Sequence, residues 1–174
     1  MKRHFTRIFF PVFLLFIASP NSFAEGEGNE YNVKAMFVLN FMKYVEWPEQ
    51  DISQDFVIGV AGDSEIVEAL QKLTVNRKEN RKIIIEKVNP LVEGNYRILI
   101  ITRHEKNRIE EWSKKYQGKQ ILIISDECRN TNFSAINLIN IQNKIRFEIN
   151  NSQARLGGIK ISSRLAELAV SVQP

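Results

Sequence analysis

The stretch KIRFEINNSQARLGGIKISSRLAELA, residues 144–169, decides the fold of this chain. Its first half alternates between apolar and polar residues, so that Ile145, Phe147 and Ile149 point to the same side of an extended chain. This alternation predicts a strand with one face on a hydrophobic core. It stops at residues 150–152, where three short polar side chains favour a turn and a helix cap.

The second half of the stretch predicts a tight corner followed by a terminal helix. Gly157-Gly158 ends a short helical run, because glycine adopts backbone angles that other residues resist. Residues 159–161 are extended again, and Ser162 or Ser163 can cap the next helix. An interior strand before this corner would bring the C-terminus to the centre of the domain. The expected apolar face of the last helix is made of Leu165, Leu168 and Ala169.

Strands and helices alternate along the rest of the chain. Continuous apolar runs bounded by turn residues predict buried strands, and apolar residues at helical spacing predict the helices between them. This alternation indicates an α/β three-layer sandwich: a mostly parallel sheet with helices on both faces and a C-terminal antiparallel hairpin. The expected strands are 55–62, 83–88, 97–102, 120–125, 136–141 and 145–150, and the expected helices are 31–46, 64–73 and 106–116.

The first 24 residues have the pattern of a cleaved secretory signal. Basic residues precede an apolar run at 8–18, and Ser22-Phe23-Ala24 supplies the small residues that precede a cleavage site. The apolar run is too short to span a bilayer comfortably, so we expect no stable membrane insertion after cleavage. Residues 25–174 are then long enough to form a single α/β domain, located in the periplasm.

The charge balance gives no indication of a polyanionic partner such as nucleic acid. The chain has 24 basic and 20 acidic side chains, but three basic residues leave with the signal, and 21 basic and 20 acidic side chains remain. Nucleic-acid binding requires a clustered positive face. The basic run Arg77-Lys78 and Arg81-Lys82 lies in a predicted loop, where such runs are usually solvated.

The mature chain has one cysteine, Cys128, and one histidine, His104. These numbers exclude an intramolecular disulfide and a zinc site built from several Cys and His side chains. Cys128 is therefore either buried and inert or available for a bond between chains. Gly59 and Gly62 lack the third glycine of a dinucleotide-binding motif, and we expect no cofactor.

Lys34 falls on the apolar side of the predicted helix 31–46, which follows a polar start at 25–30 that we expect to be flexible. A lysine in this position costs free energy unless a carboxylate meets it. One interpretation pairs Lys34 with a carboxylate from the sheet, Glu148 being the leading candidate. The other lets the lysine reach solvent past the helix end.

Polar side chains follow the predicted strands at their carboxyl ends, where ligands bind in sheets of this kind. Asp63, Arg103 and Asp126 are the candidates for a small-ligand cleft. Turns and helix caps require the same residue types, so their position alone does not establish a site. A hydrolase is the remaining alternative, and its catalytic residues would be Ser64 or Ser125, His104, and Asp63 or Asp126.

Two segments, YNVKAMFVLNFMKYVEWP at 31–48 and the stretch at 144–169, resemble the two ends of the YfiR/HmsC family. The resemblance extends through the middle of the chain. There a strand of the form FxIxVxGD, a helix, a strand, an LxI strand, a helix and an LxIxD strand follow in the family's order. It therefore covers nearly all of the mature chain. The matching residues are Lys34, Phe37, Phe41, Trp47, Pro48, Arg146, Phe147, Glu148, Ile149, Asn150, Ile159, Lys160, Ile161, Ser162, Ser163, Leu165 and Leu168.

The resemblance implies a periplasmic regulatory protein without catalytic activity. Its partner would be the periplasmic domain of an inner-membrane diguanylate cyclase, which it would hold inactive, lowering cyclic di-GMP and biofilm formation. The alternative is a small-ligand sensor acting with a histidine kinase or an outer-membrane receptor, and a homodimer is also allowed. From the residues, the partner surface is expected at Lys160, Arg164 and Glu167, beside a last helix that could instead only seal the core.

Two departures from the family pattern limit what the resemblance implies. The family usually has a cysteine where this chain has Tyr96-Arg97, and Gly-Gly-x-Ile where it has Ser134-Ala135-Ile136-Asn137. Members with paired cysteines respond to redox state through a disulfide. With Cys128 alone, this chain is not expected to do so.

The signal pattern predicts that the mature protein begins at Glu25. Mass spectrometry of the intact protein from a periplasmic extract should give the mass of residues 25–174. A protein that keeps residues 1–24 and stays with the membrane fraction would contradict the prediction.

Overall fold

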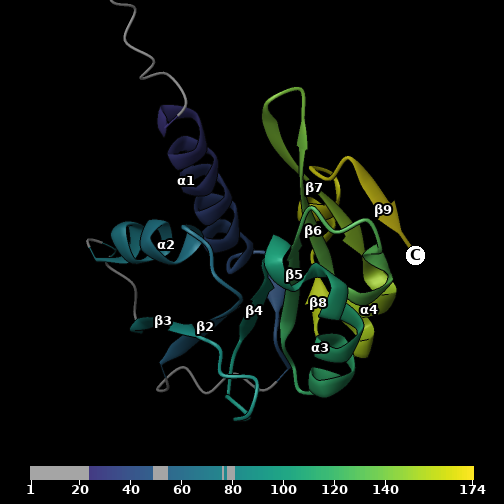
Figure 1. Ribbon diagram of the computed structural model, residues 1–174. Coiled ribbons are helices and arrows are strands. Elements are labelled where there is room, and N and C mark those ends of the chain that lie inside the picture. Colours follow the sequence, from purple (N-terminus) through teal and green to yellow (C-terminus); the bar gives the residue numbers. More distant parts are fainter. Residues whose placement is uncertain (1–23, 49–54, 76, 78–80) are drawn as a thin grey trace, which may run out of the picture.

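The computed structural model describes residues 24–48, 55–75, 77 and 81–174 (Figure 1). The predicted signal therefore lies almost wholly outside the described residues. The helices are α1 (Ala24–Phe41), α2 (Ile66–Thr74), the 3₁₀ helix η1 (Arg103–Arg108), α3 (Ile109–Tyr116), the 3₁₀ helix η2 (Thr131–Phe133), α4 (Asn151–Leu156) and α5 (Ser163–Ala166). The strands are β1 (Val45–Glu46), β2 (Phe56–Ala61), β3 (Ile83–Lys87), β4 (Ile98–Ile101), β5 (Leu122–Asp126), β6 (Ile136–Ile141), β7 (Lys144–Asn150), β8 (Lys160–Ile161) and β9 (Ser171–Gln173).

A seven-stranded sheet with the order β3-β2-β4-β5-β6-β7-β9 forms the middle layer. All neighbouring strands are parallel except β6 and β7, which form the antiparallel hairpin. Gln142 and Asn143 connect this hairpin with φ angles of 50° and 61°, the left-handed angles that a two-residue turn requires. The predicted α/β fold class, with its mostly parallel sheet and final hairpin, is confirmed.

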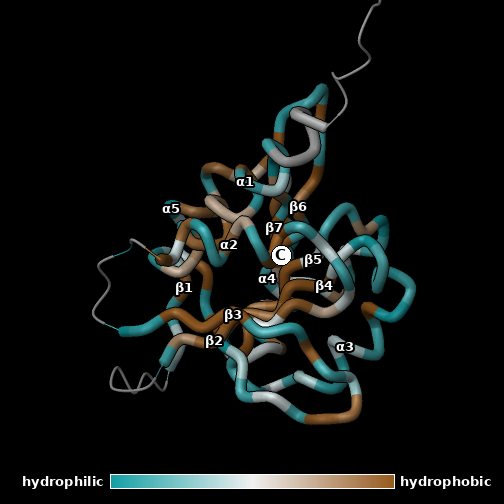
Figure 2. The backbone as a smooth tube through the Cα atoms, turned by 60° about the vertical axis from the view of Figure 1, so that its left-hand side comes forward, coloured by the Kyte–Doolittle hydropathy of each residue, from teal (hydrophilic) through white to brown (hydrophobic). Residues whose placement is uncertain are grey.

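Helices cover both faces of this sheet (Figure 1). The α1 and α2 helices lie on one face, and α3 lies on the other with α4 beside it. The central strand β4 serves both cores: Ile98 and Ile100 belong to the core under α1 and α2, and Leu99 and Ile101 to the core under α3. A strand buried on both faces needs a continuous apolar run, which explains the hydrophobic colour along the central strands in Figure 2.

The C-terminal segment closes the domain through caps that the sequence predicted. The Asn150 side chain accepts a hydrogen bond from the Gln153 N–H at 3.0 Å, and Gly158 makes the corner with a φ of 77°. The Ser162 hydroxyl then accepts from the Leu165 N–H at 3.3 Å and caps α5. Between these caps, β8 pairs with β1 in a separate two-stranded sheet.

Several predicted boundaries are wrong. The segment 25–30 is helical, because α1 begins at Ala24, and α1 ends at Phe41 because Val45–Glu46 pair with β8. Residues 106–108 belong to a 3₁₀ helix rather than to the predicted α-helix.

After α5 the chain forms β9, an additional strand on β7 that the sequence did not predict. Leu165 seals the core, but Leu168, expected on the same apolar face, is 62% exposed. Among the described residues, no helix is both long and apolar enough to cross a bilayer.

Candidate functional site

Five charged side chains meet at the carboxyl end of the central strands, and we call them the charge cluster. Glu30 and Lys34 come from α1, Arg103 follows β4, and Asp126 and Glu127 stand at the end of β5. Because β4 and β5 are parallel neighbours, their carboxyl ends lie side by side. The cluster therefore joins the first helix to the centre of the sheet.

The local structure explains how these side chains reach one another. Glu30 and Lys34 are four residues apart on a helix and therefore share a face. Asp126 is on the same face of β5 as Ile124, which belongs to the core under α1 and α2. Glu127 has a left-handed φ of 51°, so the chain turns sharply directly after the strand.

Lys34 is fully buried, with 0% of its side chain exposed. Its ammonium donates to Asp126 Oδ1 and to Glu30 Oε1, each at 2.6 Å, and lies 3.7 Å from Glu127 Oε1. Asp126 is itself only 4% exposed. The prediction that a carboxylate of the sheet meets Lys34 is correct, but the predicted partner is wrong.

Glu148 cannot be that partner because it projects from the other face of the sheet. Phe147 contacts Phe37 and Phe41 of α1, with ring centroids 5.7 and 5.1 Å apart, so α1 packs on the Phe147 side of β7. The neighbouring Glu148 points away from α1 by the alternation of a strand. Its carboxylate bonds Asn137 Nδ2 at 3.0 Å instead.

Arg103 adds a second cation at the outer side of the cluster. Its guanidinium donates to Glu127 Oε1 at 2.7 Å and also bonds Glu30, and its Nε lies 3.4 Å from Asp126 Oδ2. The ring of Tyr31 lies 6.0 Å from this guanidinium and 5.5 Å from the Lys34 ammonium. Two cations and three carboxylates thus meet in the cluster, whose formal net charge is one negative charge.

The electrostatics of the cluster keep Glu30 and Arg103 charged. Burial raises the pKa of Glu30. The hydrogen bonds and charges of Lys34 and Arg103 together lower this pKa by more than burial raises it, so it lies below its ordinary value of 4.5. Burial lowers the pKa of Arg103, whereas the charges of Asp126, Glu127 and Glu30 raise it by more. Glu30 and Arg103 are therefore both charged at neutral pH.

This arrangement suits a positioning role. Each charged side chain has an oppositely charged neighbour in the cluster. The carboxylates of the cluster are therefore all ion-paired with Lys34 or Arg103. Within the described part of the chain, no group of three or more His, Cys, Asp and Glu side chains is arranged to hold a metal ion. What the cluster does is fix α1 against the end of the sheet.

A second buried network lies on the opposite face of β5, around Asn137 of β6. The Asn137 Oδ1 accepts from the Ser125 hydroxyl at 2.8 Å and from the Cys128 N–H at 3.1 Å, and its Nδ2 donates to the Cys128 carbonyl at 3.0 Å. The Ser134 hydroxyl bonds Ser125 at 2.8 Å.

The predicted ligand cleft is only partly assembled. Arg103 and Asp126 come together, but they are ion-paired within the charge cluster. Asp63 stands apart with its side chain 87% exposed, and it pairs with Lys87 at 3.0 Å.

The hydrolase arrangement is not assembled. Ser125 is buried in the Asn137 network, and the Ser64 hydroxyl accepts from the Ile66 N–H at the start of α2. His104 Nδ1 contacts the backbone carbonyl of Asp63 at 2.7 Å. Neither serine therefore has the histidine as its hydrogen-bond partner.

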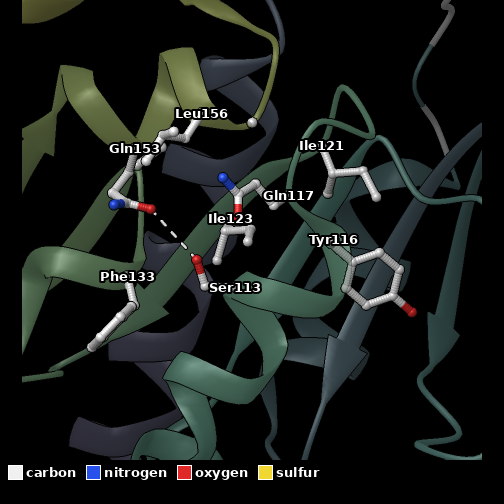
Figure 3. Close-up of a pocket in the computed structure, with 10 residues that line it drawn as sticks. Ser113, Tyr116, Gln117, Ile121, Ile123, Phe133, Gln153 and Leu156 are labelled. Atoms are coloured by element: carbon white, nitrogen blue, oxygen red, sulfur yellow. Dashed lines mark hydrogen bonds between the residues drawn. The ribbon is translucent and has the colours of Figure 1, made fainter.

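A small cavity lies between α3, α4 and β5 (Figure 3). Ser113 and Gln153 meet across it, with a hydrogen bond of 3.4 Å between their side chains. Its volume of about 10 Å³ is the space for one water molecule at most. This cavity cannot hold an organic ligand.

The two sequence motifs contact each other where α1 packs on β7. Trp47 packs edge-on against Phe56, with centroids 5.5 Å apart, whereas Pro48, Arg146 and Ser163 are exposed. Lys160, Arg164 and Glu167, the predicted partner surface, are also exposed, with Lys160 3.3 Å from Glu46. These three side chains are therefore exposed, as a partner surface requires, and their contact with a partner stays a prediction.

Sequence reasoning missed Glu30, Glu127 and Asn137. The spacing of four between Glu30 and Lys34 could have indicated the first pair, had residues 25–30 been assigned to the helix. The left-handed turn at Glu127 and the network of Asn137 depend on contacts between distant segments.

A comparison with models of known protein families matches residues 31–170 to the family described as YfiR/HmsC-like. The match includes both sequence motifs, every residue of the charge cluster except Glu30, and every strand of the seven-stranded sheet except β9. A search of curated proteins gives no significant match.

Replacing Lys34 tests the burial of the cluster. In Lys34→Ala the carboxylate of Asp126 stays buried without its main partner, so we expect the free energy of unfolding to fall by about 3–5 kcal/mol. The matched control is Lys114→Ala, which removes an exposed pair with Glu110 and should cost less than about 1 kcal/mol. Equal losses in the two variants, measured by urea unfolding at pH 7, would contradict this assignment.

The lowered pKa of Glu30 predicts a dependence of stability on pH. A carboxyl whose pKa is lowered by folding stabilises the protein above the unfolded-state value of about 4.5, and this contribution is lost as pH falls through the folded-state pKa. Glu30→Gln should therefore be destabilised relative to the parent at pH 7. The difference should shrink as pH falls below about 4.5 in urea titrations. A difference that stays constant from pH 7 to pH 3 would show that Glu30 does not contribute through its charge.

Proposed function

The chain belongs to the YfiR/HmsC-like family, and from this membership we propose that it is a periplasmic regulatory binding protein. In this proposal it binds the periplasmic domain of an inner-membrane diguanylate cyclase, or of a related sensor protein, and holds it inactive. The result is less cyclic di-GMP and less biofilm. The family match over residues 31–170 is the observation that carries the proposal.

The charge cluster supports a role in binding rather than in catalysis. Its carboxylates and cations are engaged with one another, and the helix that they position spans 18 residues at the surface of the sheet. A rigid scaffold of this kind keeps an interaction surface in a fixed geometry, which lowers the entropic cost of binding a partner. We propose no catalytic step for the protein.

The C-terminal surface formed by Lys160, Arg164 and Glu167 is our proposed contact with the partner. These three side chains are exposed and lie beside Leu165, which is 2% exposed and anchors α5 to the core. Next to them, Leu168 is 62% exposed, although an apolar side chain of this size is usually buried. An exposed leucine with charged neighbours fits an interface with an apolar centre and a polar rim.

A small-ligand sensor is the second candidate, and the structure favours it less. Of the residues proposed for its cleft, Arg103 and Asp126 already neutralise each other and Asp63 lies elsewhere. Thermal stabilisation by a metabolite of the periplasm would revive this candidate.

Deleting the gene should raise cytoplasmic cyclic di-GMP and increase biofilm, and the wild-type gene should restore both. The variant Lys160→Glu/Arg164→Glu/Glu167→Lys should fail to restore them while its melting temperature stays almost unchanged, because exposed charges contribute little to stability. The control variant Glu110→Lys/Lys114→Glu exchanges an exposed pair on α3 and should restore both phenotypes.

The two parts of this proposal can fail separately. Unchanged cyclic di-GMP after deletion would remove the cyclase as the partner. Full restoration by the triple variant would remove only the C-terminal surface.

A further inference from the structure

The strand β9 forms one edge of the seven-stranded sheet, and among the described residues β7 is its only strand neighbour. Figure 1 shows it as the outermost strand on the side away from β3. Residues 81–174 are described without a gap, so β9 and the elements beside it are complete. Two side-chain bonds hold the strand in place: Asn150 Nδ2 donates to Gln173 Oε1 at 3.0 Å, and the Ser171 hydroxyl donates to Glu148 Oε1 at 3.3 Å. The strand therefore has a defined position, although all three of its residues are exposed.

The backbone groups of β9 point alternately to β7 and to the open side. The Val170 N–H donates to the Phe147 carbonyl of β7 at 3.0 Å. In a parallel ladder such bonds recur at every second residue, so Val172 also directs its N–H and C=O groups to β7. The N–H and C=O groups of Ser171 and Gln173 point the other way. In the described part of the chain, these outward groups have no hydrogen-bond partner.

This edge lacks the features that usually keep the edges of sheets apart. Exposed edge strands are commonly protected by charged side chains or by proline, but the segment 168–174, LAVSVQP, has no charge. Pro174 does not interrupt the open side, because the alternation places its missing N–H toward β7. Val170 and Val172 are 49% and 43% exposed, and Val172 lies beside Ile149 on the face of the sheet that carries α1. The edge thus combines free backbone groups with uncovered apolar side chains.

We propose that two copies of this chain pair through β9, with the two strands antiparallel about a two-fold axis at Val172. Such an axis sets the same edge of each copy against itself. The pairing places Ser171 opposite Gln173 of the second copy, and residues paired in this way exchange both of their backbone bonds. All the outward groups of Ser171 and Gln173 are then satisfied, and the two sheets become one continuous sheet.

The position of the axis follows from the same alternation. An axis at Ser171 would set Gln173 against Ala169, whose N–H already donates to the Ala166 carbonyl at 3.2 Å. An axis at Val172 instead brings the two Val172 side chains together on one face, where directly opposite apolar residues stabilise a strand pair.

A second copy is favoured over a charged partner. An edge without charge has nothing to select an acidic or a basic strand, whereas two identical uncharged edges meet without repulsion. The pairing shares no residue with the proposed partner surface at Lys160, Arg164 and Glu167. It therefore does not depend on which membrane protein is regulated, and either proposal can fail without the other.

Sedimentation velocity of the purified protein over a wide range of concentrations tests the pairing. We expect a monomer–dimer equilibrium that shifts to the dimer as concentration rises. In Val172→Lys two ammonium groups would oppose each other across the axis, so the dimer Kd should rise at least about tenfold. The matched control is Val92→Lys, which changes a 57% exposed valine in a loop and should dimerise as the parent does.

Cysteine cross-linking tests the position of the axis. In Val172→Cys the two Cα atoms would lie about 4.5 Å apart, within the range that a disulfide bridges. In Ser171→Cys the two copies of the residue would lie diagonally, about 7–8 Å apart, which is too far. Under copper–phenanthroline oxidation we expect Val172→Cys to form the disulfide-linked dimer at least about tenfold faster than Ser171→Cys. The parent has only the buried Cys128 and should not cross-link.

Three results would overturn the proposal. A parent protein that stays monomeric at every concentration would leave the edge to a strand of another protein. Equal dimerisation of Val172→Lys and the parent would place the contact elsewhere on the surface. Equal cross-linking of the two cysteine variants would exclude an axis at Val172. The first measurement uses the unaltered protein, so it decides the matter even if a variant folds poorly.

Discussion

The burial of one ammonium group constrains the rest of this structure. Lys34 is completely removed from water, and an ammonium in that position costs several kcal/mol unless anions surround it. Asp126 from the sheet and Glu30 from the preceding helical turn meet it at 2.6 Å each. These short contacts set both the rotation of α1 about its axis and its position along β5. The apolar side chains one and two turns further along the helix, Val38 and Phe41, then lie on the sheet.

The end of β5 is held from both faces. Asp126 points toward α1, and the preceding residue, Ser125, points to the opposite face, where it joins Asn137. Two successive residues of one strand thus connect to two different buried polar groups, as the alternation of a strand requires. A buried polar group that lost its partner would remain unsatisfied, so both networks favour a single arrangement of this end of the sheet.

Most of the fold could be predicted from the sequence because its signals are local. Apolar runs gave the strands of the large sheet except β9, and the caps at Asn150 and Ser162 were correct. What failed depended on contacts between distant segments. The short β1 is a strand only because β8 lies beside it, and the choice between Glu148 and Asp126 depends on which face of the sheet α1 covers. Three of the five residues of the charge cluster, Lys34, Arg103 and Asp126, were singled out from their positions in the sequence, and Glu30 was missed because its helix was started too late.

The pairing of β1 with β8 has a consequence for the order in which the protein folds. Glu46 and Lys160 are 114 residues apart, and Lys34 and Asp126 are 92 residues apart, so the first helix acquires its partners only after most of the chain has been made. Until then its lysine has only helical neighbours to neutralise it. Closing loops over such distances costs conformational entropy, so we expect the N-terminal helix to dock after the sheet has formed. The first helix of the domain is therefore expected to be among the last elements to reach its native place.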